Sequence, residues 1–433
     1  MKRYSEYKDS GVKWIGEIPG HWKKNKIMRL FTHIGSGTTP KGDQYYTDES
    51  NGIPWINSGD LNYGFLTKCN KYITEKALND ISTLKKYPIN TLMIAMYGAS
   101  IGKYAISHIE GCTNQACCAL YGIKDELNLT YASYLMGPCK QKWIEESFGG
   151  TQPNISAEKI KQTWLPLPPL PEQEAIVTYL DSKVAKIDEY ISIAEKKIAA
   201  LEELKQTIIT EAVTRGIHKD VPMKDSGVKW IGMIPEHWEI RRLKNIVLCN
   251  SDTLSENFPK EEVIKYVEIS DVNYTSGIIN VQNISFGEAP SRARRITKKN
   301  DVIVSTVRTY LKAVAKIQED GLIVSTGFAV LHPIIGNSSF LSYFVLSESF
   351  INNVIADSKG ISYPAISTSD LVCIAMPLPP LSEQQEIVTY LDSKVANINQ
   401  LCQAERSQIE KLKEYKQRLI SDVVTGKVKV TND

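Results

Sequence analysis

The stretch from Ser291 to Lys316 contains side chains that favour contact with nucleic acid. It has four arginines and four lysines against one carboxylate, that of Asp301, and Tyr310 is interleaved with them. Such cations neutralise backbone phosphates, and the arginine fork pairs with O6 and N7 of guanine. A charged run is usually a solvated surface, but this one adjoins an expected strand and has a partial counterpart in the other half. We therefore predict DNA contacts from Arg292, Arg294, Arg295, Lys298, Lys299, Arg308, Tyr310 and Lys312.

The counterpart is a looser basic region in the first half of the chain. Six lysines between residues 68 and 103 stand against only Glu75 and Asp80. The last of them follows the glycines of GASIGKY at 98–104, which resembles a phosphate-binding loop. That loop is one residue short between its glycines and has tyrosine at the metal-binding position, so a turn is expected instead of a nucleotide site. We add Tyr97, Ser100, Lys103, Gln152 and Tyr363 as candidate DNA-binding residues.

Sequence signatures of catalysis and of metal binding are missing. The six histidines form no HExxH pattern and pair with no cysteine at zinc spacing. The eight cysteines include no CxxC pair, which favours buried reduced thiols. No dinucleotide fingerprint and no acidic-proline motif for methyl transfer is found. His21 and His237 occupy equivalent places in a repeat and are expected to be structural. The sequence predicts no catalytic residue and no metal site on this chain.

The candidate residues are carried by a chain that repeats its own segments. Residues 8–22, KDSGVKWIGEIPGHW, match residues 224–238, KDSGVKWIGMIPEHW, at 13 of 15 positions. Residues 166–187, PLPPLPEQEAIVTYLDSKVAKI, match residues 377–398, PLPPLSEQQEIVTYLDSKVANI, at 18 of 22 positions. The segments between these repeats keep only faint echoes, such as PWINSGDL at 54–61 against KYVEISDV at 265–272. A period this long indicates a duplicated domain and not a solenoid.

The diverged middle segments, about 23–165 and 239–376, are predicted to be compact mixed α/β domains. Apolar runs such as 92–97 and 301–307 predict buried strands, and helices are expected near 131–147 and 339–356. We divide the chain into a first globular domain (1–165), a first helix and linker (166–222), a second globular domain (223–376), and a second helix and tail (377–433).

Each repeated proline-rich segment leads into a long amphipathic helix. Apolar residues recur every seven positions, the period of a coiled coil, although Glu405 interrupts the second row. A helix of about 44 residues is a rod on the order of 66 Å. Packing on its own domain is the simpler alternative, but the length and the period favour antiparallel pairing of the two helices. The expected seam is Leu180, Ile187, Leu201, Ile208, Leu391, Ile398, Leu412 and Leu419.

Composition limits the class of protein. The chain has 433 residues, a formal charge of +2 and a hydrophobic share of 42%, which is ordinary globular composition. It argues against collagen, a disordered chain and a histone-like protein. No apolar stretch approaches the roughly 18 residues of a membrane span, and no apolar segment of a signal peptide follows the N-terminal charges. We expect a cytoplasmic protein with no membrane partner.

Together these motifs resemble the DNA specificity subunit of type I restriction–modification systems, over essentially the whole chain. The resemblance is carried by the repeated KDSGVKWIG segment, GIPWINSGDL at 52–61, the Gly-x-x-x-Pro-x-Ile-Ser turn, and LPLPPLPEQ before a long helix. It implies that the globular domains are target recognition domains, each reading half of a split DNA sequence, held apart by antiparallel helices. The second domain departs from the pattern at KYVEISDV, which weakens the transfer there.

The same resemblance implies the partners. They are double-stranded DNA, two methyltransferase subunits docked along the helices, and restriction or translocase subunits. The sites for S-adenosylmethionine, ATP and Mg²⁺ would lie on those partners, with no cofactor on this chain. Two other hypotheses stay open from the residues alone: a coiled-coil assembly scaffold with protein-binding domains, and an enzyme with an unrecognised site. The sequence fixes neither the bases read, nor the gap between half-sites, nor the methylated positions, nor the presence of a nuclease subunit.

Overall fold

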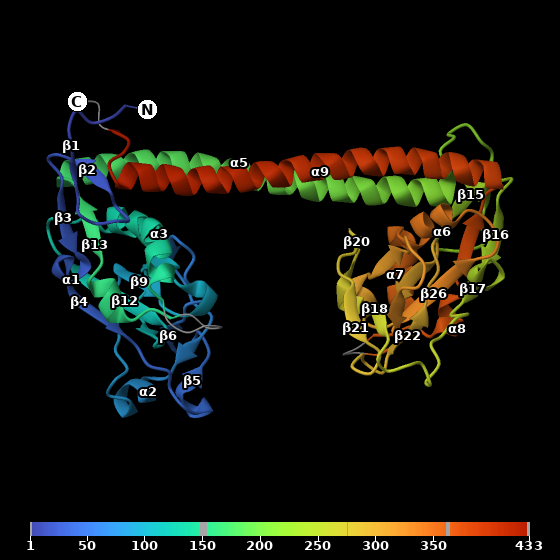
Figure 1. Cartoon of the computed structure of the whole chain (residues 1–433), viewed down its shortest axis with the longest axis horizontal. Coiled ribbons are helices and arrows are strands. Elements are labelled where there is room, and N and C mark those ends of the chain that lie inside the picture. The colour runs from blue at the N-terminus through green and yellow to red at the C-terminus, as the bar shows by residue number, and fades with distance from the viewer. Residues whose placement is uncertain (1, 148–153, 275, 361–363, 431–433) are drawn as a thin grey trace. The chain divides into compact units, whose positions relative to one another are not determined.

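A computed structural model describes residues 2–147, 154–274, 276–360 and 364–430. The chain forms two compact units, residues 1–194 with 407–433 (unit 1) and residues 195–406 (unit 2). Each unit contains one globular domain and part of each of two long helices, α5 (Leu170–Arg215) and α9 (Leu381–Val424) (Figure 1). The architecture is mixed α/β with an internal duplication, as the repeats predicted. No described helix is long and apolar enough to cross a membrane.

The globular domain of unit 1 has two β-sheets with an apolar core between them. The larger sheet has the order β4 (Phe31–Ser36), β12 (Cys117–Ile123), β9 (Thr91–Ala95), β10 (Tyr104–Ser107), β7 (Phe65–Leu66). The smaller sheet has the order β11 (Cys112–Thr113), β6 (Ile53–Ile56), β8 (Tyr72–Ile73), β5 (Tyr46–Thr47). Met93 and Ala95 of β9 pack on Ile56 of β6 in this core. Short helices α1 (Ile27–Leu30), α2 (Glu75–Asp80) and α4 (Ala157–Lys161) complete the domain with the longer α3 (Leu129–Glu145).

The globular domain of unit 2 repeats this sheet plan with a different sequence. Its sheets have the orders β17 (Val247–Cys249), β26 (Phe328–Pro333), β23 (Val302–Ser305), β24 (Val314–Lys316), and β21 (Gln282–Ser285), β18 (Val263–Val267), β25 (Ile323–Ser325), β22 (Ala293–Ile296). A parallel pair links β18 to β25, as one links β6 to β11 in unit 1. The hairpin of β19 (Val272–Asn273) and β20 (Gly277–Ile278) and the helix α8 (Thr368–Leu371) complete the domain.

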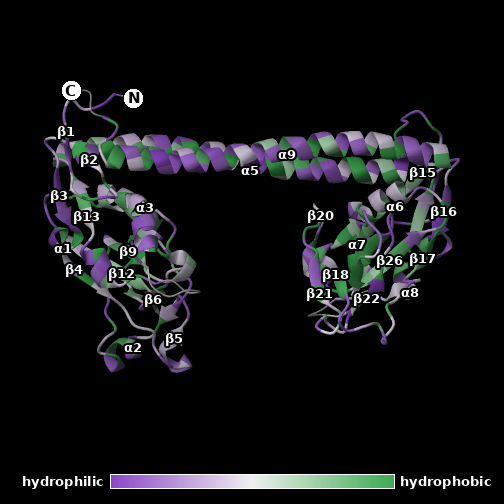
Figure 2. Cartoon of the chain, viewed as in Figure 1, coloured by the Kyte–Doolittle hydropathy of each residue, from purple (hydrophilic) through white to green (hydrophobic). Residues whose placement is uncertain are grey.

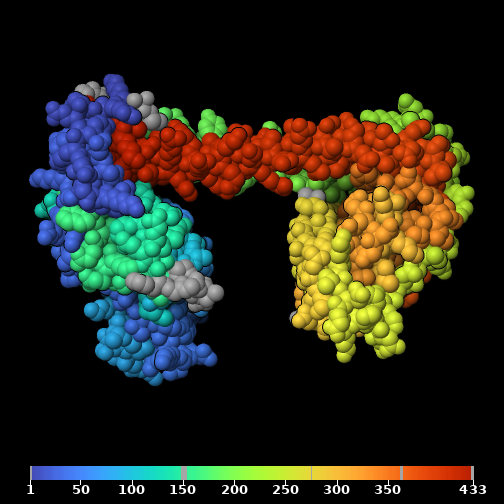
Figure 3. Space-filling model, viewed as in Figure 1, coloured from blue at the N-terminus to red at the C-terminus, as the bar shows by residue number. Residues whose placement is uncertain are grey.

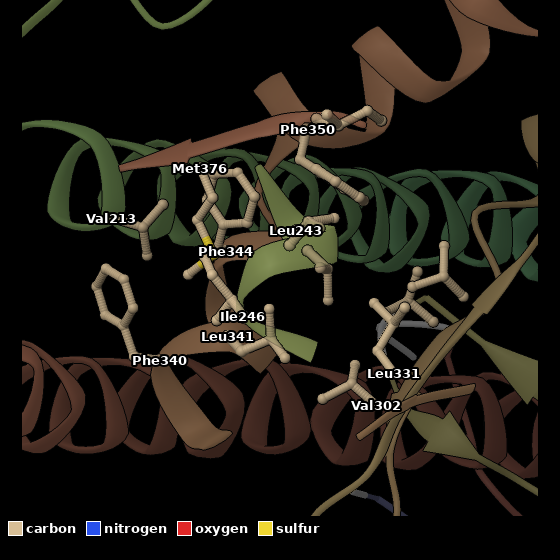
Figure 4. Close-up of a cluster of buried hydrophobic side chains, with 14 of the residues drawn as sticks. Val213, Leu243, Ile246, Val302, Leu331, Phe340, Leu341, Phe344, Phe350 and Met376 are labelled. Carbon is tan, nitrogen blue, oxygen red and sulfur yellow. The ribbon is translucent and has the colours of Figure 1, made fainter. Parts of the chain in front are cut away.

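One expected helix of unit 2 is two helices. The segment predicted near 339–356 forms α6 (Ser338–Val345) and α7 (Glu348–Asp357). The break occurs because the Ser347 hydroxyl accepts a hydrogen bond from the backbone N–H of Phe350 and so caps a new helix. Figure 4 shows the core that α6 closes, which is formed by Val213 of α5 together with Leu243, Ile246, Val302, Leu331, Phe340, Leu341 and Phe344.

The two long helices pair in antiparallel fashion within each unit. In unit 2, Lys197 of α5 bonds Glu405 of α9. Further along α5, Lys205 bonds Asn399, which comes earlier in α9, at 3.2 Å. In unit 1 Lys416 lies 2.7 Å from Asp188. The prediction of an antiparallel coiled coil is confirmed. The first helix ends at Arg215, and the following Gly216 has φ +78°, the left-handed conformation typical of a helix C-terminus.

The predicted seam is largely buried. Leu180, Ile187, Leu391, Ile398 and Leu419 are buried, whereas Leu201, Ile208 and Leu412 are half-buried. Hydrophobic residues, coloured green in Figure 2, recur along the helices of each unit. One seam residue was missed: Lys205 is 4% exposed, and its ammonium group lies 2.6 Å from Glu202. The buried cation is therefore paired.

The repeated sequence motifs meet where each long helix begins. In unit 1 one oxygen of Glu172 accepts from the Trp22 indole at 3.0 Å and lies 2.9 Å from His21 Nε2. In unit 2 Glu383 makes the same contacts with Trp238 at 3.0 Å and His237 at 2.7 Å. The structural role predicted for the two histidines is confirmed. The next residue, Gln173 or Gln384, bonds the chain just before α3 or α6 at 2.8 Å.

Candidate nucleic-acid interface

In each unit a short 3₁₀ turn follows a central strand and lies against the described C-terminal part of the Gly-x-x-x-Pro-x-Ile-Ser segment. In unit 1 the turn is Gly98–Ser100, and the Ile155 N–H bonds the Met96 carbonyl at 2.9 Å. In unit 2 the turn is Thr309–Leu311, and the Ile366 N–H bonds the Thr306 carbonyl at 2.9 Å. We call these surfaces the loop edge of each unit: residues 96–103 with 154–156, and residues 306–312 with 364–367.

The loop edges expose large side chains that globular surfaces usually cover. Tyr97 is 43% exposed in unit 1, and Tyr310 and Leu311 are 50% and 45% exposed in unit 2. Arg308 and Lys312 have φ values of 50° and 53°, a left-handed backbone that costs energy for residues with a side chain. The Lys312 ammonium lies 5.5 Å from the Tyr274 ring. The predicted Arg308, Tyr310 and Lys312 thus share one strained, exposed loop.

Only some of the other predicted cations of unit 2 lie near this loop. Arg292 lies beside it, because its carbonyl accepts from Thr326 N–H and the adjacent Gly327 carbonyl accepts from Thr306 N–H, both at 2.8 Å. The guanidinium of Arg292 pairs with Glu268. The intervening strand β22 runs for four residues, about 13 Å. Lys298 and Lys299 therefore lie at the opposite edge of the sheet.

Local partners hold the cations at and beyond β22. Lys298 lies 2.8 Å from Asp252, and this hydrogen bond raises the pKa of the lysine. Arg294 stacks 4.7 Å from the centre of the Phe286 ring. Arg295 donates a hydrogen bond to the Thr253 hydroxyl at 3.4 Å, although its buried Nε has no partner among the described residues. These contacts tie Arg294, Arg295 and Lys298 into the packing of the domain.

In unit 1 the structure places Tyr97, Ser100 and Lys103 together on the loop edge. Tyr97 forms a β-bridge with Asn154, the counterpart of the bridge between Val307 and Ala365 in unit 2. Gly102 precedes Lys103 with φ +76°, so the turn depends on a glycine at this point. The remaining candidates, Gln152 and Tyr363, lie outside the described residues.

Sequence reasoning missed one pair of equivalent residues beside the loop edges. Asn57 and Glu268 each begin a turn in which the backbone N–H bonds an aspartate, Asp60 at 2.8 Å and Asp271 at 3.0 Å. The side chain of Asn57 accepts from Asn114 at 3.0 Å, whereas that of Glu268 pairs with Arg292. The echo between PWINSGDL and KYVEISDV was the available signal. The same backbone turn therefore carries the amide of Asn57 in unit 1 and the ion pair of Glu268 with Arg292 in unit 2.

The described residues offer no alternative catalytic centre of the metal type. No group of three or more histidine, cysteine, aspartate or glutamate side chains among them is placed to hold a metal ion. Burial raises the pKa of the Cys117 and Cys118 thiols to about 12, which keeps them protonated and unreactive at neutral pH.

Comparisons with known proteins give the same answer for both halves of the chain. The family model of the type I restriction modification DNA specificity domain matches residues 19–203 and again residues 235–411. The type I restriction enzyme MjaVIII specificity subunit of Methanocaldococcus jannaschii is 28% identical over 329 residues, 72% of each chain. The MjaIX specificity subunit of the same organism is 26% identical over 458 aligned positions, 98% of this chain and 97% of the relative.

A solved structure supports the fold. It is a chain from a study of complex assembly and conformational transition of the type I restriction–modification system. The TM-score is 0.68 at 16% sequence identity, and the alignment covers 94% of this chain and 98% of that one.

Proposed function

The chain belongs to the type I restriction–modification DNA specificity family and carries two copies of its domain, and from this premise we propose how it recognises DNA. It is a DNA sequence-specificity subunit in which each globular domain serves one half of a bipartite, asymmetric target. Two specificity domains in one chain favour this function over a scaffold with protein-binding domains. The proposal concerns the surface that reads the bases and the surface that holds the other subunits.

The loop edge of each unit is the proposed DNA-reading surface. The observation that carries this assignment is that two strongly diverged domains keep one backbone arrangement at this edge, the bonds Ile155–Met96 and Ile366–Thr306. The exposed side chains on that frame differ, with Tyr97, Ser100 and Lys103 in unit 1 and Arg308, Tyr310 and Lys312 in unit 2. A constant frame with variable tips suits two domains that read different half-sites.

The outward faces of the long helices are the proposed docking surfaces for two methyltransferase subunits. The segment TYLDSKVA occurs unchanged in both helices, at 178–185 and 389–396. Asp181 and Asp392 connect the long helices to the globular domains, because they accept hydrogen bonds from Tyr134 of α3 and Tyr343 of α6 at 2.6 Å. Thr178, Ser182 and Ala185 are exposed, as are their counterparts Thr389, Ser393 and Ala396. The viewed face of α9 is uncovered over most of its length in Figure 3.

Two identical faces on one chain fit two copies of one partner. The chemistry of methyl transfer, and of cleavage where it occurs, would reside on partners, and this chain would supply recognition and assembly. The restriction or translocase subunits would then join the core of specificity and methyltransferase subunits. Each partner remains a proposal for this chain.

Methylation mapping tests the DNA-reading surface. The chain is co-expressed with the methyltransferase of its own system, and the methylated motif is read from host DNA. We expect a split motif, in which Ser100→Ala with Lys103→Ala alters one half-site and Tyr310→Ala with Lys312→Gly alters only the other. Glycine at 312 tolerates the positive φ, so the change removes the side chain without straining the loop. Unchanged half-sites and unchanged DNA affinity in both variants would refute the assignment.

A further inference from the structure

Three strand ends of unit 2 meet beside its loop edge. β18 runs parallel to β25, and β22 runs antiparallel to β25 on the other side. The residue that follows β18 and the residue that precedes β22 therefore flank the end of β25. These residues are Glu268 and Arg292, and the guanidinium of Arg292 donates a hydrogen bond to the carboxylate of Glu268. The ion pair thus bridges the end of β25.

Gly327, two residues after β25, connects the end of this sheet to the loop edge. Its carbonyl accepts hydrogen bonds from the Thr306 N–H at 2.8 Å and from the Thr306 hydroxyl at 2.9 Å. A Cβ built on Gly327 would lie 2.7 Å from Ile269, the first residue of the turn after β18, and 3.0 Å from Val307. A glycine at this point therefore lets that turn and the loop edge approach each other closely. The ion pair adjoins the loop edge.

The carboxylate of Glu268 is fixed by its own turn. It caps the 3₁₀ turn Ile269–Asp271 by accepting from the backbone N–H of Asp271, and the Glu268 N–H bonds the Asp271 carboxylate at 3.0 Å. Asp271 is buried and also accepts hydrogen bonds from Asn280 at 3.0 Å and from Gln282 at 2.7 Å. Glu268 therefore has little freedom, and a guanidinium bonded to it is held in a defined orientation.

Arg292 exposes hydrogen-bond donors beside the loop edge. Its side chain is 52% exposed, compared with 26% for the side chain of Glu268. A guanidinium has five N–H donors, and the hydrogen bond to Glu268 uses one of them. Stability gives little reason for the arrangement, because half-exposed ion pairs contribute little to folding. An external ligand with hydrogen-bond acceptors gives a better reason.

Guanine is the base that suits an arginine held in this way. Its O6 and N7 atoms both accept hydrogen bonds in the major groove, and one arginine fork reaches both. The carboxylate of Glu268 disfavours a backbone phosphate at the same place, because two anions repel each other. A fixed arginine beside a carboxylate therefore favours a base contact over a phosphate contact.

The described residues of unit 1 hold no such pair at the equivalent place. The counterpart of β25 is β11, whose Thr113 carbonyl accepts from the Thr38 N–H at 3.0 Å on the side where β22 runs in unit 2. Asn57 occupies the position of Glu268. The threonine and the asparagine are uncharged, so the two domains present different chemistry at one equivalent site.

We propose that Arg292 reads a guanine in the half-site of unit 2, and that Glu268 is the residue that positions the guanidinium. This inference rests on the proposed function and adds to the loop edge a base contact from the second sheet of the domain. It requires at least one G·C pair in the half-site of unit 2.

Modified DNA tests the guanine contact in the complex of this chain with the methyltransferase of its own system. Each guanine of the split motif is replaced in turn by 7-deazaguanine, which lacks N7. We expect one replacement to lower the affinity of the unaltered complex roughly tenfold, because one hydrogen bond of the arginine fork is lost. The same replacement should change the affinity of the Arg292→Ala complex by less than about twofold, since the contact is already absent.

Glu268→Gln tests the positioning role. The variant keeps the size of the side chain and removes its charge, so the preference for G·C over A·T at the identified position should fall roughly tenfold. Arg292→Lys should lose this preference as well, because lysine has no fork. Lys265→Ala is the matched control, since it removes the exposed ion pair with Glu319 in the same domain and should leave the preference intact. A merely structural role of Glu268 would lower the melting temperature and leave the preference unchanged.

Three results would overturn the inference. The Arg292→Ala complex could respond to every modified duplex as the unaltered complex does, or the half-site that it alters could contain no G·C pair. Alternatively, Arg292→Ala could weaken binding to all sequences alike and reduce the salt slope by about one, which is the signature of a phosphate contact. In each of these cases the split motif itself is present. Failure of the proposed function differs, because the unaltered complex would then methylate no split motif.

Discussion

The junction between helix and globular domain is nearly the same in the two units, whereas the loop edges differ in most exposed side chains. Glu172 and Glu383 hold the same tryptophan and histidine to within 0.2 Å in each distance. At the loop edges, one backbone frame presents Ser100 and Lys103 in unit 1 but Tyr310 and Lys312 in unit 2. The duplicated chain is thus its own comparison: the residues that join helix to domain are retained, whereas the side chains on the proposed DNA-reading surfaces differ.

The largest expected effect comes from removing the tryptophan of each junction. Trp22 and Trp238 are fully buried, so Trp22→Ala and Trp238→Ala should each lower the free energy of unfolding by about 3–5 kcal/mol. If the junctions are equivalent, hydrogen exchange will show loosening confined to unit 1 for the first variant and to unit 2 for the second. A loss in one unit only, with the other variant stable, would break the comparison.

Removing the carboxylate of the junction should cost less. Glu172→Ala and Glu383→Ala leave the buried indole N–H of Trp22 or Trp238 without an acceptor, and we expect a loss of about 1–3 kcal/mol in each case. Glu172→Gln retains an acceptor oxygen and should recover part of the loss. Denaturant unfolding of the full chain measures the differences. Equal stability of Glu172→Ala and the unaltered chain would show that this contact does not hold the domain.

A change at one loop edge should alter recognition without altering assembly. Arg308→Asn suits the left-handed backbone at this position and removes the guanidinium. We expect about 1–3 kcal/mol less discrimination at a position of the half-site read by unit 2 if Arg308 contacts a base. If it contacts phosphate, affinity for all sequences should fall and the salt slope should shrink by about one. Lys299→Asn, at the opposite edge of the sheet, is the matched control and should leave the methylated motif intact.

The sequence predicted what local pattern encodes. The repeats revealed the duplication and the long helices. Glu172, Gln173 and Trp22 make the same contacts as their counterparts in unit 2, and these shared contacts account for the shared sequence. It did not predict that the basic run of unit 2 is divided between two edges of a sheet. That division follows from the pairing of β22 with β25, a long-range register that no local spacing of arginines indicates.

Lys205, Asn57 and Glu268 were missed because sequence pattern alone does not reveal their contacts. Lys205 occupies a seam position that a heptad analysis assigns to an apolar residue, and only its contacts with Glu202 and Asn399 explain its burial. Asn57 and Glu268 differ in chemistry, so composition could not connect them. Their shared backbone turn connects them, and a search for equivalent aspartates at 60 and 271 would have found them.

The smallest expected effect distinguishes the two polar contacts within the helix pair. Lys416→Met removes the ion pair with Asp188, whose side chain is 51% exposed, and should cost at most about 1 kcal/mol. Lys205→Met replaces a nearly buried lysine, and Glu202 keeps Arg406 as a partner 3.4 Å away, so stability should be unchanged or slightly higher. Thermal unfolding of both variants measures the difference. If Lys205→Met lowers the stability more than Lys416→Met does, the buried cation stabilises the seam. The helix pair of unit 2 would then depend on a buried polar contact, unlike that of unit 1.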